Sequence, residues 1–168
     1  MFKKLFGSKE KPIVSVEFMS PLNGDCLSLT EVPDPVFSQK MMGDGVAILP
    51  SEGKVVSPVE GEVIQVFPTK HAIGLKAKNG AEILIHIGLE TVSMNGEGFE
   101  TFVEQGDSVE VGDVLVEFDM NLVNEKAKST ISPIIITNGD QVEIKLKASG
   151  EYSVRAGETP LLTLTNKS

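Results

Sequence analysis

The chain has 168 residues, of which 40% are hydrophobic and 5% aromatic, with no tryptophan, and its formal net charge at pH 7 is −9. A chain of this size and composition folds as one domain with a sizeable core of aliphatic side chains, so a disordered protein is excluded. The negative charge argues against a nucleic-acid partner and favours partners with a basic docking face.

Other features of the composition predict where the protein works. The single Cys26 cannot form an internal disulfide, and the chain contains no apolar run long enough to span a membrane. The N-terminus also lacks the apolar region of a secretory signal peptide. These features predict a cytoplasmic protein, and transient partners favour a monomer.

The first residues differ from the rest of the chain. Residues 1–12 are basic and lightly apolar, and Pro12 separates them from the first predicted strand. We expect a flexible tail over residues 1–12 and a single domain over residues 13–168. Residues 1–6 combine phenylalanine, leucine and lysine, which allows a weak contact with an anionic membrane.

After Pro12 the sequence has many short alternating or β-branched runs separated by Gly, Pro and Asn. This pattern predicts an all-β fold, an antiparallel β-sandwich or barrel. Two internal echoes, SPLNG (20–24) with SPVEG (57–61) and SVEVGD (108–113) with SVRAGE (153–158), indicate a duplicated motif. One or two short helices are predicted, at residues 98–105 and 122–128.

The dipeptide Asn79-Gly80 predicts a β-hairpin, because it suits a two-residue turn with positive φ at both central positions. In that register Lys78 pairs with Ala81, Ile73 lies opposite His86, and His71 lies opposite Gly88. His71 and His86 then become diagonal neighbours on one face of the hairpin.

These two histidines are the only ones in the chain. The simplest interpretation of each is an isolated core or surface residue, and a register shifted by one residue would place them on opposite faces. Their convergence instead predicts a shared site, where a neutral imidazole is a competent nucleophile near neutral pH.

Several segments together resemble the glucose-type EIIA proteins of the bacterial phosphoenolpyruvate:sugar phosphotransferase system. The segments are PDPVF (33–37), GDGVAI (43–48), FPTKHA (67–72), IHIGLETV (85–92), GEGF (96–99) and EKAKST (125–130). The sequence around Lys70 and Glu90 is similar to the Bacillus-type Gram-positive form. Because the chain ends without a permease, a free-standing protein is expected.

The resemblance implies a phosphoryl relay without metal or cofactor. His86 would receive the phosphoryl group on Nε2 from the phosphohistidine of the carrier HPr and pass it to a cysteine of an EIIB domain. The carbonyl of Gly88 would hold the other nitrogen of His86. His71 would donate a hydrogen bond to the phosphoryl oxygens, and the Thr69 hydroxyl would hold His71.

The resemblance also implies a docking surface for HPr and EIIB. An apolar surround that excludes water would comprise Val36, Phe37, Met41, Met42, Phe67, Leu84, Ile87 and Val92, with Pro35 beside them. We expect Val36, Phe37, Met41 and Met42 to be exposed. Asp34, Glu90 and Asp140 would form an acidic rim that meets arginines of the partners. Glu90 is one methylene longer than the aspartate usual in the family.

Two alternatives remain open. In a zinc hydrolase, His71 and His86 would bind metal together with a carboxylate such as Asp140, but the chain has neither an H-x-H pair at His86 nor an H-E-x-x-H motif. A regulatory protein would bind enzymes or transporters through the same apolar surface and be switched by phosphorylation of His86. The sequence does not identify the sugar.

Overall fold

The computed structural model describes residues 12–148 and 150–167. In them it has fourteen strands: β1 (Ser15–Met19), β2 (Gly24–Ser28), β3 (Asp44–Pro50), β4 (Lys54–Val56), β5 (Gly61–Val66), β6 (Ala72–Ala77), β7 (Glu82–His86), β8 (Phe99–Thr101), β9 (Ser108–Val109), β10 (Val114–Phe118), β11 (Ser132–Ile136), β12 (Val142–Leu146), β13 (Tyr152–Val154) and β14 (Pro160–Asn166). The helices are α1 (Pro35–Ser38) and α2 (Met120–Lys126), with 3-10 turns η1 (Leu29–Glu31) and η2 (Thr91–Met94).

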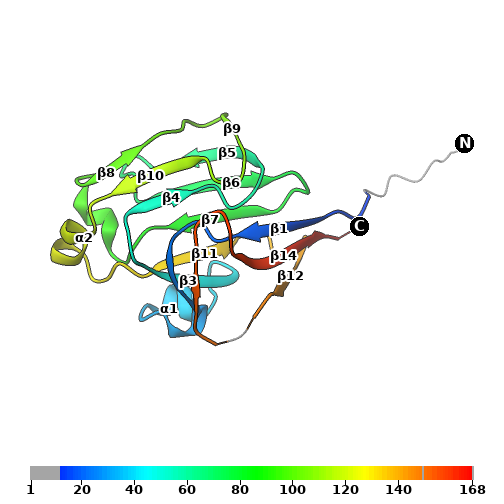
Figure 1. Cartoon of the computed structure of the whole chain (residues 1–168), viewed down its shortest axis with the longest axis horizontal. Helices are drawn as coiled ribbons and strands as arrows, with labels where there is room; N and C mark the ends of the chain where they lie inside the picture. The colour runs from blue at the N-terminus through cyan, green and yellow to red at the C-terminus, as the bar shows by residue number, and fades with distance from the viewer. Residues whose placement is uncertain (1–11, 149, 168) are drawn as a thin grey trace, which may run out of the picture.

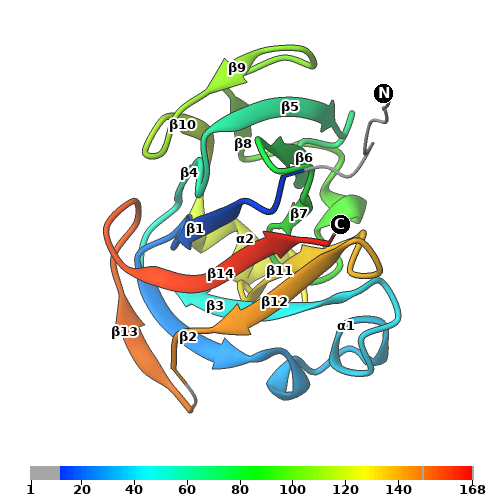
Figure 2. The same ribbon diagram turned by 90° about the vertical axis from the view of Figure 1, so that its right-hand side faces the viewer.

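All the strand pairings are antiparallel, in one eight-stranded sheet and two three-stranded sheets (Figure 1). The ribbon β1-β14-β12 crosses the large sheet, as Figure 2 shows. Side chains from both layers, including Phe18, Leu164, Ile73 and Ile85, form the main core between them. The prediction of an all-β antiparallel sandwich is therefore confirmed.

The predicted helices fared differently. The helix expected at residues 122–128 is α2, which begins after Asp119 because the Asp119 carboxylate accepts a hydrogen bond from the backbone N–H of Leu122. The helix expected at residues 98–105 is wrong. Part of that segment is β8, because Phe99 pairs with Phe118 and both rings are buried in the main core.

Residues 1–11 of the predicted tail, and with them the predicted membrane contact of residues 1–6, lie outside the described residues. Within residues 12–148 and 150–167, no helix combines the length and the apolar character that crossing a membrane requires.

The internal echoes of the sequence form matching corners of the fold. Ser20 and Ser57 are buried, and each donates its hydroxyl to the carbonyl two residues further along, over 2.6 and 2.7 Å. The carbonyl of Ser20 accepts from the N–H of Gly157, and that of Ser57 accepts from the N–H of Gly112, over 2.8 and 2.9 Å. The first Ser-Pro segment (20–24) thus bonds to the segment 153–158 in the same way as the second (57–61) bonds to the segment 108–113.

The same duplication orders the large sheet, β13-β2-β3-β11-β7-β6-β5-β9. β2 and β5 follow the two Ser-Pro echoes, while β13 and β9 belong to the other pair of echoes. The sheet is therefore symmetric about its central pair, β11 and β7, where Ile134 lies opposite Ile85. The strand order of the sheet therefore confirms the prediction of a duplicated motif.

The β6–β7 hairpin exists, but its predicted register is wrong by one residue. His86 lies opposite Ala72 rather than Ile73, and Ala77 donates its backbone N–H to the carbonyl of Ala81. The turn therefore contains three residues. Only Gly80 in it has a positive φ, of 92°, whereas a two-residue turn would need positive φ at Asn79 as well.

The shifted register does not separate the two histidines, because His71 lies before β6 rather than inside it. Lys70 adopts a left-handed φ of 64°, so the chain turns sharply just before His71. The alternation of side chains along a strand therefore does not govern the direction of the His71 ring. The His71 carbonyl still accepts a hydrogen bond from the N–H of Ile87, over 2.7 Å.

This left-handed turn predicts an unusual response to mutation. The left-handed conformation costs a non-glycine residue about 1–2 kcal/mol. Because glycine also loses roughly 0.5–1 kcal/mol through greater freedom in the unfolded chain, Lys70→Gly should raise the free energy of unfolding slightly or leave it unchanged. Lys70→Val should lower it by about 1–2 kcal/mol, since a β-branched residue resists this φ. Urea denaturation measures both values.

A second exposed lysine, Lys76, is the matched control, because it lies within β6, where no residue has a positive φ. Lys76→Gly should lower the free energy of unfolding by roughly 0.5–1 kcal/mol. Equal destabilisation by glycine at positions 70 and 76 would contradict this account of the turn.

Candidate functional site

The rings of His71 and His86 meet, as the sequence predicted. Their centroids are 5.0 Å apart and their planes cross at 81°. His86 ends β7 and is half-buried, whereas His71 precedes β6 and is only 5% exposed. The β7 strand and the turn before β6 therefore bring one partly accessible imidazole and one nearly covered imidazole together.

A backbone carbonyl orients the His86 ring. Nδ1 of His86 lies 2.8 Å from the carbonyl oxygen of Gly88, and a carbonyl can only accept, so Nδ1 carries the proton. Nε2 of the neutral ring is then left with a free lone pair. Gly88 has a φ of 73°, and a Cβ at this position would lie 2.7 Å from Cγ2 of Thr91. Only glycine fits this turn without displacing its neighbours.

His71 is held by Thr69 and Phe67. The Thr69 hydroxyl lies 2.6 Å from Nδ1 of His71, and the Phe67 ring meets the His71 ring edge-on with centroids 5.7 Å apart. A hydroxyl can donate to Nδ1, which leaves the proton of the neutral ring on Nε2. Thr69 therefore lies where the resemblance places a residue that supports His71.

Both rings are neutral at neutral pH. Burial, followed by the neighbouring His86, lowers the pKa of His71 to about 4. Burial also lowers the pKa of His86, although the hydrogen bond to the Gly88 carbonyl and the charge of Asp34 act in the opposite direction. Desolvation disfavours the charged form of an imidazole, which explains the direction of both shifts.

Four of the predicted docking residues are exposed apolar side chains. They are Val36, Met41, Met42 and Val92, and Met41 is 69% exposed. Val36 belongs to α1, the two methionines follow α1, and Val92 lies in η2. Large apolar side chains exposed near one site are typical of a surface that binds a partner. Phe67 is half-buried beside His71.

Three other apolar residues of the predicted surround, Phe37, Leu84 and Ile87, are buried, which corrects their assignment, whereas Pro35 is exposed. Phe37 is covered because its ring packs on the His86 ring, with centroids 4.9 Å apart. Leu84 lies with Phe37 in a second core cluster under α1. Ile87 is fully buried in the main core, on the other face of the sheet. Ile87 therefore cannot touch a partner, and Phe37 supports the site from within.

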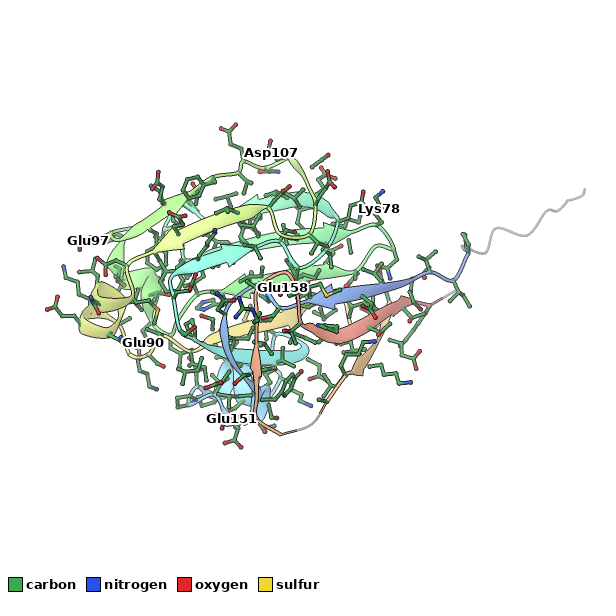
Figure 3. The ribbon with its side chains drawn as sticks, in the orientation of Figure 1. Lys78, Glu90, Glu97, Asp107, Glu151 and Glu158 are labelled. Carbon is green, nitrogen blue, oxygen red and sulfur yellow. The ribbon has the colours of Figure 1, made fainter. Side chains whose placement is uncertain are left out.

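The three predicted acidic residues do not form one group, because Asp140 lies apart from the histidine pair. Asp34 is half-buried before α1, where its carboxylate accepts a hydrogen bond from the N–H of Val36, and its charge reaches His86. Glu90 is exposed with a φ of 59°, and Figure 3 shows it far from Lys78 at the hairpin tip.

Asp140 is exposed but lies away from the histidines. The same loop is joined to the hairpin tip, since the side chain of Asn138 donates to the carbonyl of Gly80. That tip is at the opposite end of β7 from His86. The structure therefore does not place Asp140 beside the histidine pair, and a zinc site that combines it with both histidines is not assembled. Among the described residues, no three His, Cys, Asp or Glu side chains are close enough to hold a metal.

Sequence reasoning missed three polar residues that support the site. Thr91 and Ser132 are fully buried and bond to the backbone around Gly88. The ammonium of Lys128 donates to the carbonyl of Pro33 over 2.7 Å and so ties down the segment before Asp34. One signal was available for Ser132, because it is a single hydroxyl within an otherwise apolar run at residues 131–136.

Comparison with known proteins identifies the family. The family model described as phosphoenolpyruvate-dependent sugar phosphotransferase system, EIIA 1, matches residues 16–142. A glucose-specific EIIA component of Bacillus cereus is 56% identical over 167 residues, covering 99% of this chain and all of the relative. One from Staphylococcus epidermidis is 52% identical over 165 residues, covering 98% of this chain and 99% of the relative.

A solved structure agrees with the sequence comparisons. Glucose permease IIA from Mycoplasma capricolum has 42% sequence identity and a TM-score of 0.79, and the match covers 91% of this chain and 96% of that one. Together with the sandwich fold and the paired histidines, these matches confirm the resemblance that the sequence motifs indicated. The chain therefore belongs to the EIIA 1 family of the phosphoenolpyruvate-dependent sugar phosphotransferase system.

Proposed function

We propose that this phosphoryl carrier of sugar uptake takes its phosphoryl group on Nε2 of His86, from the phosphohistidine of HPr, and passes it to a cysteine of an EIIB domain. The observation that carries the proposal is the hydrogen bond from Nδ1 of His86 to the Gly88 carbonyl. It leaves Nε2 as an unprotonated nucleophile beside a second imidazole.

The proposed chemistry is two displacements at phosphorus. The Nε2 lone pair of His86 attacks the phosphorus, the P–N bond to the HPr histidine breaks, and its electron pair returns to that ring. In the second step an EIIB thiolate attacks the phosphorus and the P–Nε2 bond breaks. Nδ1 keeps its proton on the Gly88 carbonyl in both steps. Such loose transition states depend on alignment and on hydrogen-bond donors around the phosphoryl oxygens.

We assign the role of donor to His71. When the Thr69 hydroxyl donates to Nδ1 of His71, the neutral ring carries its proton on Nε2. That N–H can then bind a phosphoryl oxygen on the neighbouring His86, and the burial of His71 strengthens the interaction. His71 would therefore matter more for transfer than for the initial attachment of the group.

The proposed docking surface consists of Val36, Met41, Met42 and Val92 with Asp34 and Glu90. The apolar members are exposed and can exclude water from the reacting rings. The two carboxylates can meet cationic side chains on a basic partner, in keeping with the chain's net charge of −9. Asp140 would contribute only at the periphery.

We further propose that the carrier is a monomer. The names of its relatives favour a glucose system.

A regulatory function on the same surface is the second candidate, and the exposed methionines favour it. Met41 and Met42 offer adaptable apolar contacts to several partners. A phosphoryl group on His86 would add about 1.5–2 negative charges beside these contacts and would weaken any complex that buries them. Relay and regulation are therefore compatible.

The relay predicts which variants accept phosphate. In a mixture of phosphoenolpyruvate, enzyme I and HPr, the protein should acquire an acid-labile, base-stable label, and His86→Ala should acquire none because the nucleophile is missing. His71→Ala should still be labelled but should transfer the label to EIIB at least about tenfold more slowly, since it lacks the phosphoryl donor.

Lys78→Ala provides the control for this assay, because Lys78 lies at the hairpin tip, at the other end of the molecule from Glu90, as Figure 3 shows. It should be labelled like the parent protein. Full labelling of His86→Ala would refute the assignment of the acceptor.

The buried state of His71 predicts a dependence of stability on pH. Its folded pKa of about 4 is below the unfolded value of 6.5, so the unfolded chain binds the proton more tightly. The corresponding stability is present above pH 6.5 and is lost as the pH falls towards 4. Between these limits the parent should lose roughly 2–3 kcal/mol more than His71→Gln. Urea denaturation across this range, with His86 present in both proteins, tests the difference; parallel curves would contradict it.

A further inference from the structure

The peptide group between Ile87 and Gly88 is held from both sides by buried hydroxyls. The carbonyl of Ile87 accepts a hydrogen bond from the Thr91 hydroxyl over 2.6 Å. The N–H of Gly88 donates to the Ser132 hydroxyl over 3.2 Å. This peptide immediately precedes the one whose carbonyl holds Nδ1 of His86. Thr91 and Ser132 therefore act on the segment that orients the ring without touching the ring themselves.

The next peptide is held as well. The N–H of Leu89 donates to the carbonyl of Ser129 over 2.9 Å. The Gly88 carbonyl and this N–H belong to the same peptide group, so the hydrogen bond also fixes the carbonyl. Ser132 in turn donates its hydroxyl to the carbonyl of Thr130 over 2.9 Å. The chain between α2 and β11 thus forms a support for the left-handed turn at Gly88.

Because Thr91 and Ser132 are buried, the hydrogen bonds of their hydroxyls have no substitute. Both Thr91 and Ser132 are 0% exposed, so water cannot replace either hydroxyl when it is removed. A buried carbonyl or N–H that loses its partner pays the full cost of desolvation, and the backbone moves to find another partner. In this segment any such movement shifts the Gly88 carbonyl relative to His86.

We propose that Thr91 and Ser132 are positioning residues of the phosphoryl relay, whose hydroxyls lock the peptide before Gly88 so that its carbonyl keeps the His86 ring in one tautomer and one orientation. The inference rests on the proposed function of His86. The ring gains positive character as Nε2 binds phosphorus, and a fixed carbonyl at Nδ1–H stabilises that charge without rearrangement. A displaced carbonyl would misalign Nε2 with the incoming phosphorus.

The test compares three variants of the full chain. Thr91→Val removes a hydroxyl with almost no change in shape, Ser132→Ala removes the second hydroxyl, and Thr91→Ser restores the first. Ser57→Ala is the matched control, because Ser57 is also 0% exposed and donates its hydroxyl to the carbonyl of Val59 in another corner of the fold. All variants should lose stability, and Thr91→Ser loses it only through its missing buried methyl group, because it keeps the hydrogen bond to Ile87.

Two measurements separate positioning from general stability. Nitrogen-15 NMR of the imidazoles reports the tautomer and the pKa of His86 in the unphosphorylated protein. Thr91→Val and Ser132→Ala should lower the proportion of the Nδ1–H tautomer and lower the pKa of His86, because the Gly88 hydrogen bond raises that pKa. Their rates of phosphoryl acceptance from phospho-HPr should fall at least about tenfold. Ser57→Ala should change neither quantity, and Thr91→Ser should recover both.

The outcomes distinguish this inference from the proposed function. If Thr91→Val and Ser132→Ala match Ser57→Ala in the tautomer of His86 and in the rate, the two hydroxyls are merely structural and the inference is wrong. If the parent protein itself is not labelled on His86, the proposed function fails. The NMR comparison still decides whether the two hydroxyls orient the ring.

Discussion

The hydrogen bond between Nδ1 of His86 and the carbonyl of Gly88 is the constraint on which the site depends. It places the proton of a neutral ring on one nitrogen and leaves the other free to react. It requires a left-handed turn with no Cβ at Gly88, and it requires the neighbouring peptides to stay in place. The buried hydroxyls of Thr91 and Ser132 meet the second requirement. In the proposed relay, the nucleophile is thus prepared by backbone geometry rather than by a charged base.

The site is an asymmetric feature of a nearly symmetric sheet. Ile85 and Ile134 face each other at the centre, so the position equivalent to His86 in the other half is Ile135, which is fully buried. One half of the duplication therefore packs an aliphatic side chain where the other half presents an imidazole. Because the imidazoles are desolvated, they stay neutral. The second core cluster, which includes Phe37 and Leu84, supports the rings from below, while Met41 and Val92 remain exposed.

Much of this arrangement could be inferred from residues alone. Repeated short runs between Gly and Pro predicted the antiparallel sandwich, and the helix predicted at residues 122–128 corresponds to α2. The echoes predicted the duplication because each Ser-Pro motif repeats a local feature, a serine hydroxyl that donates to the carbonyl two residues further along. The helix expected at residues 98–105 failed because burial of Phe99 against Phe118 decided that segment. The hairpin register failed because Asn79 does not adopt the positive φ that a two-residue turn needs.

By itself, the sequence determined that two histidines belong to one hairpin and that glycine follows the second, because turn chemistry and spacing are local properties. Only the tertiary structure decided which side chains reach the surface. Phe37, Leu84 and Ile87 are buried, whereas Val36 and Met41 are equally apolar but exposed. The difference comes from packing in the two core clusters, which the sequence pattern does not show. The partners of Gly88 were likewise invisible, because Ser132 is 44 residues away along the chain and approaches it only when β11 pairs with β7.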